Sequence, residues 1–135
     1  MRTHPFLRAY MAGIVFPTVV LLFGVTAFTI ARYAYHVPIP IERAIMFPLT
    51  VVPNLWGVWN MLYLAVGGER RWSIGVHGAV LPLILIPLGL LLARLFAIDL
   101  VTPSLAALFA PMGIAAYYLI WKHVVAFLNA ELGIA

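Results

Sequence analysis

The sequence contains no cysteine and very little charge. Of its 135 residues only 9% are charged, whereas 65% are hydrophobic, and the mean hydropathy is +1.09. The lack of cysteine excludes disulfides, thiolate chemistry and cysteine-based metal sites. Ordinary soluble domains carry about 25% charged residues. The low charge therefore excludes a soluble domain and indicates an integral membrane protein.

The sequence also lacks acidic residues inside its apolar runs, since Glu42, Glu69, Asp99 and Glu131 all lie at their ends. Membrane-embedded enzymes and ion-coupled carriers place ionisable groups within the bundle. No HExxH, GxSxG, Walker or dinucleotide motif is present. We therefore expect a protein that is neither an enzyme nor a proton-coupled exporter. The net charge of +4 is spread over short loops and predicts an orientation, not nucleic-acid binding.

Four apolar segments are long enough to cross a bilayer as helices, which takes about 20 residues each. The segments are residues 9–31, 44–68, 72–93 and 103–121. Several contain proline, which predicts kinked helices. Short connections favour antiparallel neighbours. The sequence thus predicts an all-α, polytopic membrane protein, a single domain over residues 1–135 with four transmembrane helices in an antiparallel bundle.

The start of the last apolar segment has a helix-capping pattern. Thr102 precedes Pro103, and this order is typical of an N-cap followed by proline at the first helical position. The helix can continue past Lys122, because a lysine head group reaches the membrane surface on its long stem.

A weak internal repeat crosses the chain. Gly13, Pro17 and Gly24 are followed 65 residues later by Gly78, Pro82 and Gly89, and Trp56 recurs as Trp121 at the same offset. The spacing hints at two weakly repeated helical hairpins. At other positions the two halves are no more similar than two unrelated segments of equally apolar composition would be.

The central segment, residues 44–68, has an unusual distribution of polar and small residues. On a helical wheel one stripe and its edges hold Thr50, Pro53, Asn54, Trp56, Gly57, Asn60, Tyr63 and Gly67. The opposite face is aliphatic. We predict that the polar, small face meets protein and the aliphatic face meets lipid. The asparagine amides either tie helices together, which is their commoner use, or line a path or a ligand site.

His77 and His123 lie near the end of the bundle that carries both termini. A neutral imidazole can ligate the iron of haem or the magnesium of a chlorophyll, and nearby tryptophan and tyrosine would suit a flat ring. The spacing is unspecific, because His123 can lie among lipid headgroups and His77 can bond to Ser73. Cofactor binding by these histidines is therefore an alternative to a structural role.

The basic residues are unequally divided between the two ends. Arg2, Arg8, Arg70, Arg71 and Lys122 share the side of the termini, whereas Arg32, Arg43 and Arg94 lie on the other side. The excess favours both termini in the cytoplasm, in a bacterial-type inner membrane.

Three functions fit these observations. The first is a non-enzymatic structural or accessory subunit that packs through its helices in a homo-oligomer or with other membrane subunits. The second is a haem- or chlorophyll-binding subunit of an electron-transfer or light-harvesting complex. The third is a small oligomeric transporter or channel with Thr50, Asn54 and Asn60 along its path.

Overall fold

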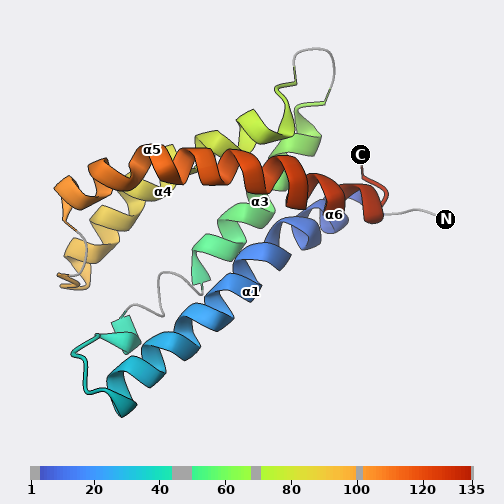
Figure 1. Cartoon of the computed structure of the whole chain (residues 1–135). Coiled ribbons are helices and arrows are strands. Elements are labelled where there is room, and N and C mark those ends of the chain that lie inside the picture. Colours follow the sequence, from blue (N-terminus) through green and yellow to red (C-terminus); the bar gives the residue numbers. More distant parts are fainter. Residues whose placement is uncertain (1–3, 44–49, 68–70, 100–101, 135) are drawn as a thin grey trace.

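The computed structural model describes residues 4–43, 50–67, 71–99 and 102–134, and its regular elements in these ranges are helices. The elements are α1 (Pro5–Ala34), α3 (Val52–Ala65), α4 (Ile74–Leu95), α5 (Pro103–Ile120), the π-helical turn η1 (Trp121–Val125) and α6 (Ala126–Glu131) (Figure 1). The prediction of an all-helical fold is confirmed.

Three stretches are long and apolar enough to cross a membrane, namely Pro5–Ala34, Ile74–Leu95 and Pro103–Glu131. They contain the predicted segments 9–31, 72–93 and 103–121, apart from the first two residues of 72–93. The remaining segment, 44–68, is only partly described, because residues 44–49 and 68 lie outside the described ranges. Its helix α3 has 14 residues, or about 21 Å at 1.5 Å per residue, which is less than a bilayer core of about 30 Å. A count of four spans stays a prediction.

The helix ends follow local sequence signals. Thr102 accepts a hydrogen bond from the Leu105 N–H and Pro103 occupies the first turn, as the capping pattern predicts. Pro53 lies in the first turn of α3, where its missing N–H removes no helical hydrogen bond. Pro53 therefore lies at the start of α3, and the part of the predicted segment before Thr50 lies outside the described residues. Pro17 and Pro82 do lie inside their helices.

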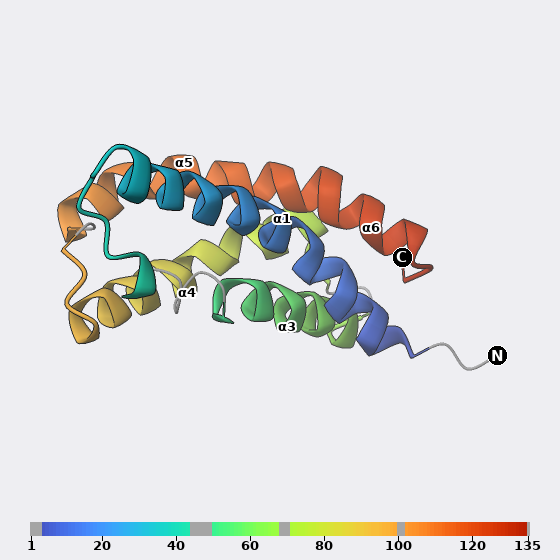
Figure 2. The ribbon, with the colours of Figure 1, turned by 90° about the horizontal axis from the view of Figure 1, so that it is seen from below.

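The helices pack as two pairs. Helix α1 packs chiefly along α3, and α4 packs chiefly along α5. The pairs converge near the chain termini and diverge toward the opposite end, where the connections after α1 and α4 lie (Figure 1). Figure 2 shows the α5–α6 rod on one side of the molecule and α3 on the other, while α1 crosses from the side of α5 at its C-terminal end to the side of α3 at its N-terminal end.

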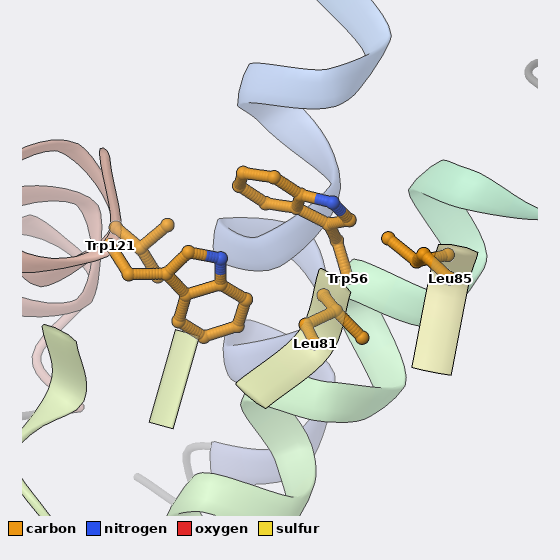
Figure 3. Close-up of a cluster of buried hydrophobic side chains, with 5 residues drawn as sticks. Trp56, Leu81, Leu85 and Trp121 are labelled. Carbon is orange, nitrogen blue, oxygen red and sulfur yellow. The ribbon is translucent and has the colours of Figure 1, made fainter. Parts of the chain in front are cut away.

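The core lies at the convergent end. Its buried hydrophobic cluster consists of Trp56, Leu81, Leu85, Trp121 and Val125, which come from α3, α4 and η1 (Figure 3). Helix α5 has no buried residue, and the buried residues of α1 end at Pro17. The divergent halves of α1 and α5 therefore expose apolar side chains, as helices that face lipid do.

Candidate functional site

The two tryptophans at the convergent end each rest on a glycine of the neighbouring helix. A Cβ atom at Gly13 of α1 would lie 2.6 Å from the carbonyl oxygen of Trp56 and 2.8 Å from the Cα atom of Gly57. A Cβ atom at Gly78 of α4 would collide with the Cβ and Cγ atoms of Trp121. Small residues allow such close approach between membrane helices, so both positions require glycine.

The indole rings of these tryptophans join the two helix pairs. Their ring centroids are 5.3 Å apart with planes inclined at 37°, and Figure 3 shows Leu81 beside them. Phe16 stacks on Trp56 from α1, and Tyr117 contacts it from α5 at 4.9 Å between centroids. Aromatic pairs at such distances add about 0.5–1.5 kcal/mol each to burial. The cluster is the main hydrophobic link between the pairs.

The indole N–H groups of the two tryptophans differ. Trp56 Nε1 donates to the hydroxyl of Tyr117 at 3.2 Å. In the described part of the chain, Trp121 Nε1 is the buried side-chain nitrogen or oxygen that has no hydrogen-bond partner. Trp121 also opens the π-helical turn, a feature that is rare and often found at functional sites.

A buried pair of amides connects three helices. Asn60 of α3 donates to Asn129 of α6 at 2.7 Å, and Asn129 donates back at 3.0 Å. The Asn60 amide also donates to the Ala9 carbonyl of α1 at 2.7 Å. Both side chains are almost fully buried, with exposed fractions of 1% and 2%. The side-chain oxygen and nitrogen of both residues each have a partner, so this group ties α1, α3 and α6 together.

Asn54, Thr50 and Tyr10 form a second polar group near the start of α3. The Tyr10 hydroxyl of α1 donates to the Asn54 side-chain oxygen, and the Asn54 amide donates to the Thr50 carbonyl. Unlike Asn60, Asn54 is exposed. The structure thus places Asn54 and Asn60 in two separate hydrogen-bonded groups, both of which join α3 to α1.

His77 is enclosed by protein groups. Its Nε2 atom lies 2.9 Å from the Trp59 carbonyl oxygen, and Trp59 Nε1 donates to the His77 carbonyl oxygen at 2.8 Å. A carbonyl oxygen can only accept, so Nε2 carries the proton. The Trp59 ring stacks on the imidazole at 4.8 Å, and the Tyr63 ring lies 5.1 Å away. Ligation through Nε2 would require this reciprocal pair to break.

His123 occupies a different environment. It is exposed on η1, whereas His77 is buried with 8% of its surface exposed. Tyr63 lies beside the predicted polar stripe and packs between His77 and Arg71. The Arg71 guanidinium carbon is 4.4 Å from the centroid of the Tyr63 ring. The structure therefore brings Tyr63, His77 and Trp121 together at the convergent end and leaves His123 on the surface.

The chemistry available in this region is that of hydrogen-bonded packing. Within the described residues there is no group of three or more histidine, cysteine, aspartate or glutamate side chains able to hold a metal ion. The buried polar side chains come from Asn60, His77 and Asn129. All three bond to other residues of the chain, which suits them to fix helix positions.

Sequence reasoning missed Asn129 and the partner of His77. Asn129 lies at the end of the chain beyond the expected last span, yet it follows Trp121 and Val125 at intervals of four residues. That spacing puts all three on one helical face and could have marked Asn129 as inward-facing. No sequence signal identifies the Trp59 carbonyl as the partner of His77.

Comparison of the chain with known protein families, with curated proteins and with solved structures finds no match.

Proposed function

We propose that this protein is a non-enzymatic structural or accessory membrane subunit that acts through helix–helix packing. In this proposal the chain crosses a bacterial-type inner membrane four times, in segments 9–31, 44–68, 72–93 and 103–121. Both termini lie in the cytoplasm. The protein assembles with further copies of itself or with other membrane subunits.

Support comes first from the way the interior uses its polar groups. Asn60 and Asn129 satisfy each other, and His77 and Trp59 form a reciprocal pair. Interhelical hydrogen bonds of this kind are a common means of helix association in membranes. A catalytic or transport site needs polar groups that face a substrate, and these groups face one another.

The observation that carries the proposal is the contrast among the glycines. Gly13, Gly57, Gly75 and Gly78 pack against neighbouring residues, whereas a Cβ atom at Gly24 or Gly113 would meet nothing within 4 Å. Gly24 lies on the divergent half of α1 and Gly113 on α5, which has no buried residue. Small residues at membrane-helix surfaces let another helix approach closely. These two glycines are thus available to a partner helix.

The experiment enlarges the open glycines without touching the fold. Gly24→Leu and Gly113→Leu should leave the monomer folded, because a Cβ atom at either position would meet nothing within 4 Å. If a partner helix packs at Gly24 or Gly113, the two variants should lower the amount of assembled protein about tenfold. Blue-native electrophoresis after gentle extraction measures this amount. Leu22→Phe and Leu108→Phe are matched controls that enlarge exposed residues on other faces of the same helices. Normal assembly of both glycine variants would contradict the proposal.

The two alternative functions have less support from the geometry. A haem or chlorophyll ligand at His77 would have to bind Nδ1, since Nε2 is bonded to the Trp59 carbonyl. The imidazole is 8% exposed and contacts the Trp59 and Tyr63 rings, which leaves little room for a flat macrocycle. A transport path along Asn54 and Asn60 requires amides that are bonded to Tyr10 and Asn129 to turn toward a solute.

A further inference from the structure

The contacts between glycine and tryptophan occupy equivalent places in the two helix pairs. Gly13 of α1 lies against Trp56, and Gly78 of α4 lies against Trp121. The two glycines are 65 residues apart in the sequence, and so are the two tryptophans. The first helix of each pair therefore approaches the second at the same point, and the two indole rings meet between the pairs. The internal repeat of the sequence thus corresponds to two similarly packed helix pairs.

The hydrophobic core that joins the two pairs lies at the convergent end. The tryptophan rings meet there, and Asn60 bonds to Asn129. Away from this end, α5 has no buried residue, and the last buried residue of α1 is Pro17. The pairs accordingly diverge in Figure 1. Helix pairs that are packed together at one end can change their mutual angle by a hinge motion.

A short segment after α1 contacts both pairs at the divergent end. Residues 41–43 are helical and are called the bridging segment below. Glu42 accepts hydrogen bonds from Arg32, in the last turn of α1, at 2.7 and 2.8 Å. The next residue, Arg43, donates to the carbonyl oxygen of Ala97 at 3.2 Å. The bridging segment is thus attached to the first pair through Glu42 and to the second pair through Arg43.

The end of α4 holds the acceptor of the Arg43 bond in place. Ala97 has a φ of 50°, in the left-handed region that residues other than glycine rarely adopt. The Ile98 N–H bonds to the Ala93 carbonyl at 2.8 Å, and the Ala97 N–H bonds to the Arg94 carbonyl at 3.3 Å. These two bonds form the Schellman motif of a helix end. The motif uses the N–H of Ala97, and the carbonyl oxygen of Ala97 accepts from Arg43.

We propose that the bridging segment holds the divergent ends of the two pairs together, and that its release lets the pairs move apart about the tryptophan cluster. One hydrogen bond changes an equilibrium by only about fivefold. The bond from Arg43 is exposed, so it opens readily, whereas the buried rings at the convergent end keep the pairs joined. The result is a hinge that one weak contact closes. This inference concerns the motion of the chain and does not depend on the proposed packing function.

The test measures distances between spin labels by double electron–electron resonance, with the full chain in phosphatidylcholine nanodiscs. The sequence has no cysteine, so introduced cysteines alone carry the labels. Phe28→Cys with Leu108→Cys labels exposed positions on the divergent halves of α1 and α5, and Leu7→Cys with Phe127→Cys labels exposed positions at the convergent end. Without further substitution, the divergent labels should show a main distance and a longer, less populated one. The convergent labels should show a single distance.

Removal of the attachments should favour the longer distance between the divergent labels. Arg43→Met keeps the apolar stem but removes the donors, and should raise the ratio of the longer to the shorter distance about fivefold. Glu42→Ala removes the attachment to α1 and should shift the ratio in the same direction. Arg43→Lys keeps a charged donor and should shift it less. Arg94→Met is the matched control, because it removes an exposed basic residue at the same end of the molecule, and it should keep the original ratio.

Unchanged distances in Arg43→Met and Glu42→Ala would overturn the proposal, and so would an equal shift in Arg94→Met. Equal broadening at the convergent labels would overturn it too, because that result indicates a general loss of packing instead of a hinge motion.

Discussion

The two helix pairs bring their tryptophans into the core by different contacts. In the first pair, Gly13 of α1 lies against the backbone of Trp56 and Gly57 in α3. In the second pair, Gly78 of α4 lies against the side chain of Trp121 in η1. The first contact is between two backbones, whereas the second is between a backbone and a ring. The approach at Gly13 is therefore limited by main-chain atoms, whereas the approach of α4 to α5 and η1 is limited by side chains, those of Trp121 at Gly78 and Tyr118 at Gly75.

The hydrogen bonding of the two tryptophans differs as well. The Trp56 N–H reaches Tyr117 of the other pair, whereas the Trp121 N–H is buried without a partner among the described residues. A buried donor without a partner costs about 1–3 kcal/mol. The two rings fill similar places, but only Trp56 also contributes a hydrogen bond between the pairs. We infer that substitutions in the two helix pairs lower stability by different amounts, and the following predictions test this difference.

The largest expected effect is that of adding a methyl group at the packed glycines. Gly78→Ala and Gly13→Ala should each lower the free energy of unfolding by about 3 kcal/mol, because overpacking a close contact costs about 1–3 kcal/mol or more. Gly78→Ala should be the worse, since its new Cβ meets the base of a fully buried ring. Gly24→Ala is the control and should change stability by less than about 0.5 kcal/mol. Unfolding in SDS, followed by circular dichroism, measures all three, and equal losses at the three sites would contradict the packing described here.

The second test compares the indole N–H groups directly. Trp56→Phe removes a bonded donor and leaves the Tyr117 hydroxyl without it, whereas Trp121→Phe removes a donor that has no partner. Both variants lose ring volume, so the difference between them isolates the hydrogen bond. We expect Trp56→Phe to be less stable than Trp121→Phe by about 1–3 kcal/mol. Equal stability would show that the Trp121 N–H has a partner of its own, and ultraviolet resonance Raman spectroscopy of the indole would confirm it.

A smaller effect is expected at the amide pair that joins α3 of the first pair to α6. Asn60→Leu should cost about 1–2 kcal/mol, because it leaves Asn129 and the Ala9 carbonyl without their partner. The double variant Asn60→Leu with Asn129→Leu should recover part of that loss, since replacing both partners by apolar groups can be nearly neutral. Additive losses in the double-mutant cycle would contradict the reciprocal bonding. Asn54→Leu is the exposed control and should cost less.

The parts of this structure that the sequence could predict are those decided locally. Apolar length located α1, α4 and α5, and the Thr102–Pro103 pattern located the start of α5 within the chain. Contacts between distant residues could not be predicted in this way. Asn60 meets Asn129 across 69 positions, and that meeting depends on a crossing of α3 and α6 that no local pattern specifies. The same holds for His77, whose partner is a backbone carbonyl and leaves no mark on the sequence.

The smallest effect concerns the divergent end, where the two pairs have different connections. In the first pair Arg32 forms an ion pair with Glu42 at 2.7 Å. Arg43 of the same connection donates to the carbonyl of Ala97, in the connection of the second pair, at 3.2 Å. The hydrogen bond from Arg32 holds the pKa of Glu42 below its ordinary value. Because the folded pKa is the lower one, the ion pair stabilises the fold above the unfolded pKa and is lost as pH falls through the folded pKa.

Carbon-13 NMR of the Glu42 carboxyl should therefore show a lowered pKa that Arg32→Gln raises toward the ordinary value, while Arg43→Gln should raise it less. Stability near neutral pH should hardly change in either variant, because an exposed ion pair contributes little. A large loss of stability in Arg32→Gln would mean that the divergent end, like the convergent end, depends on specific contacts.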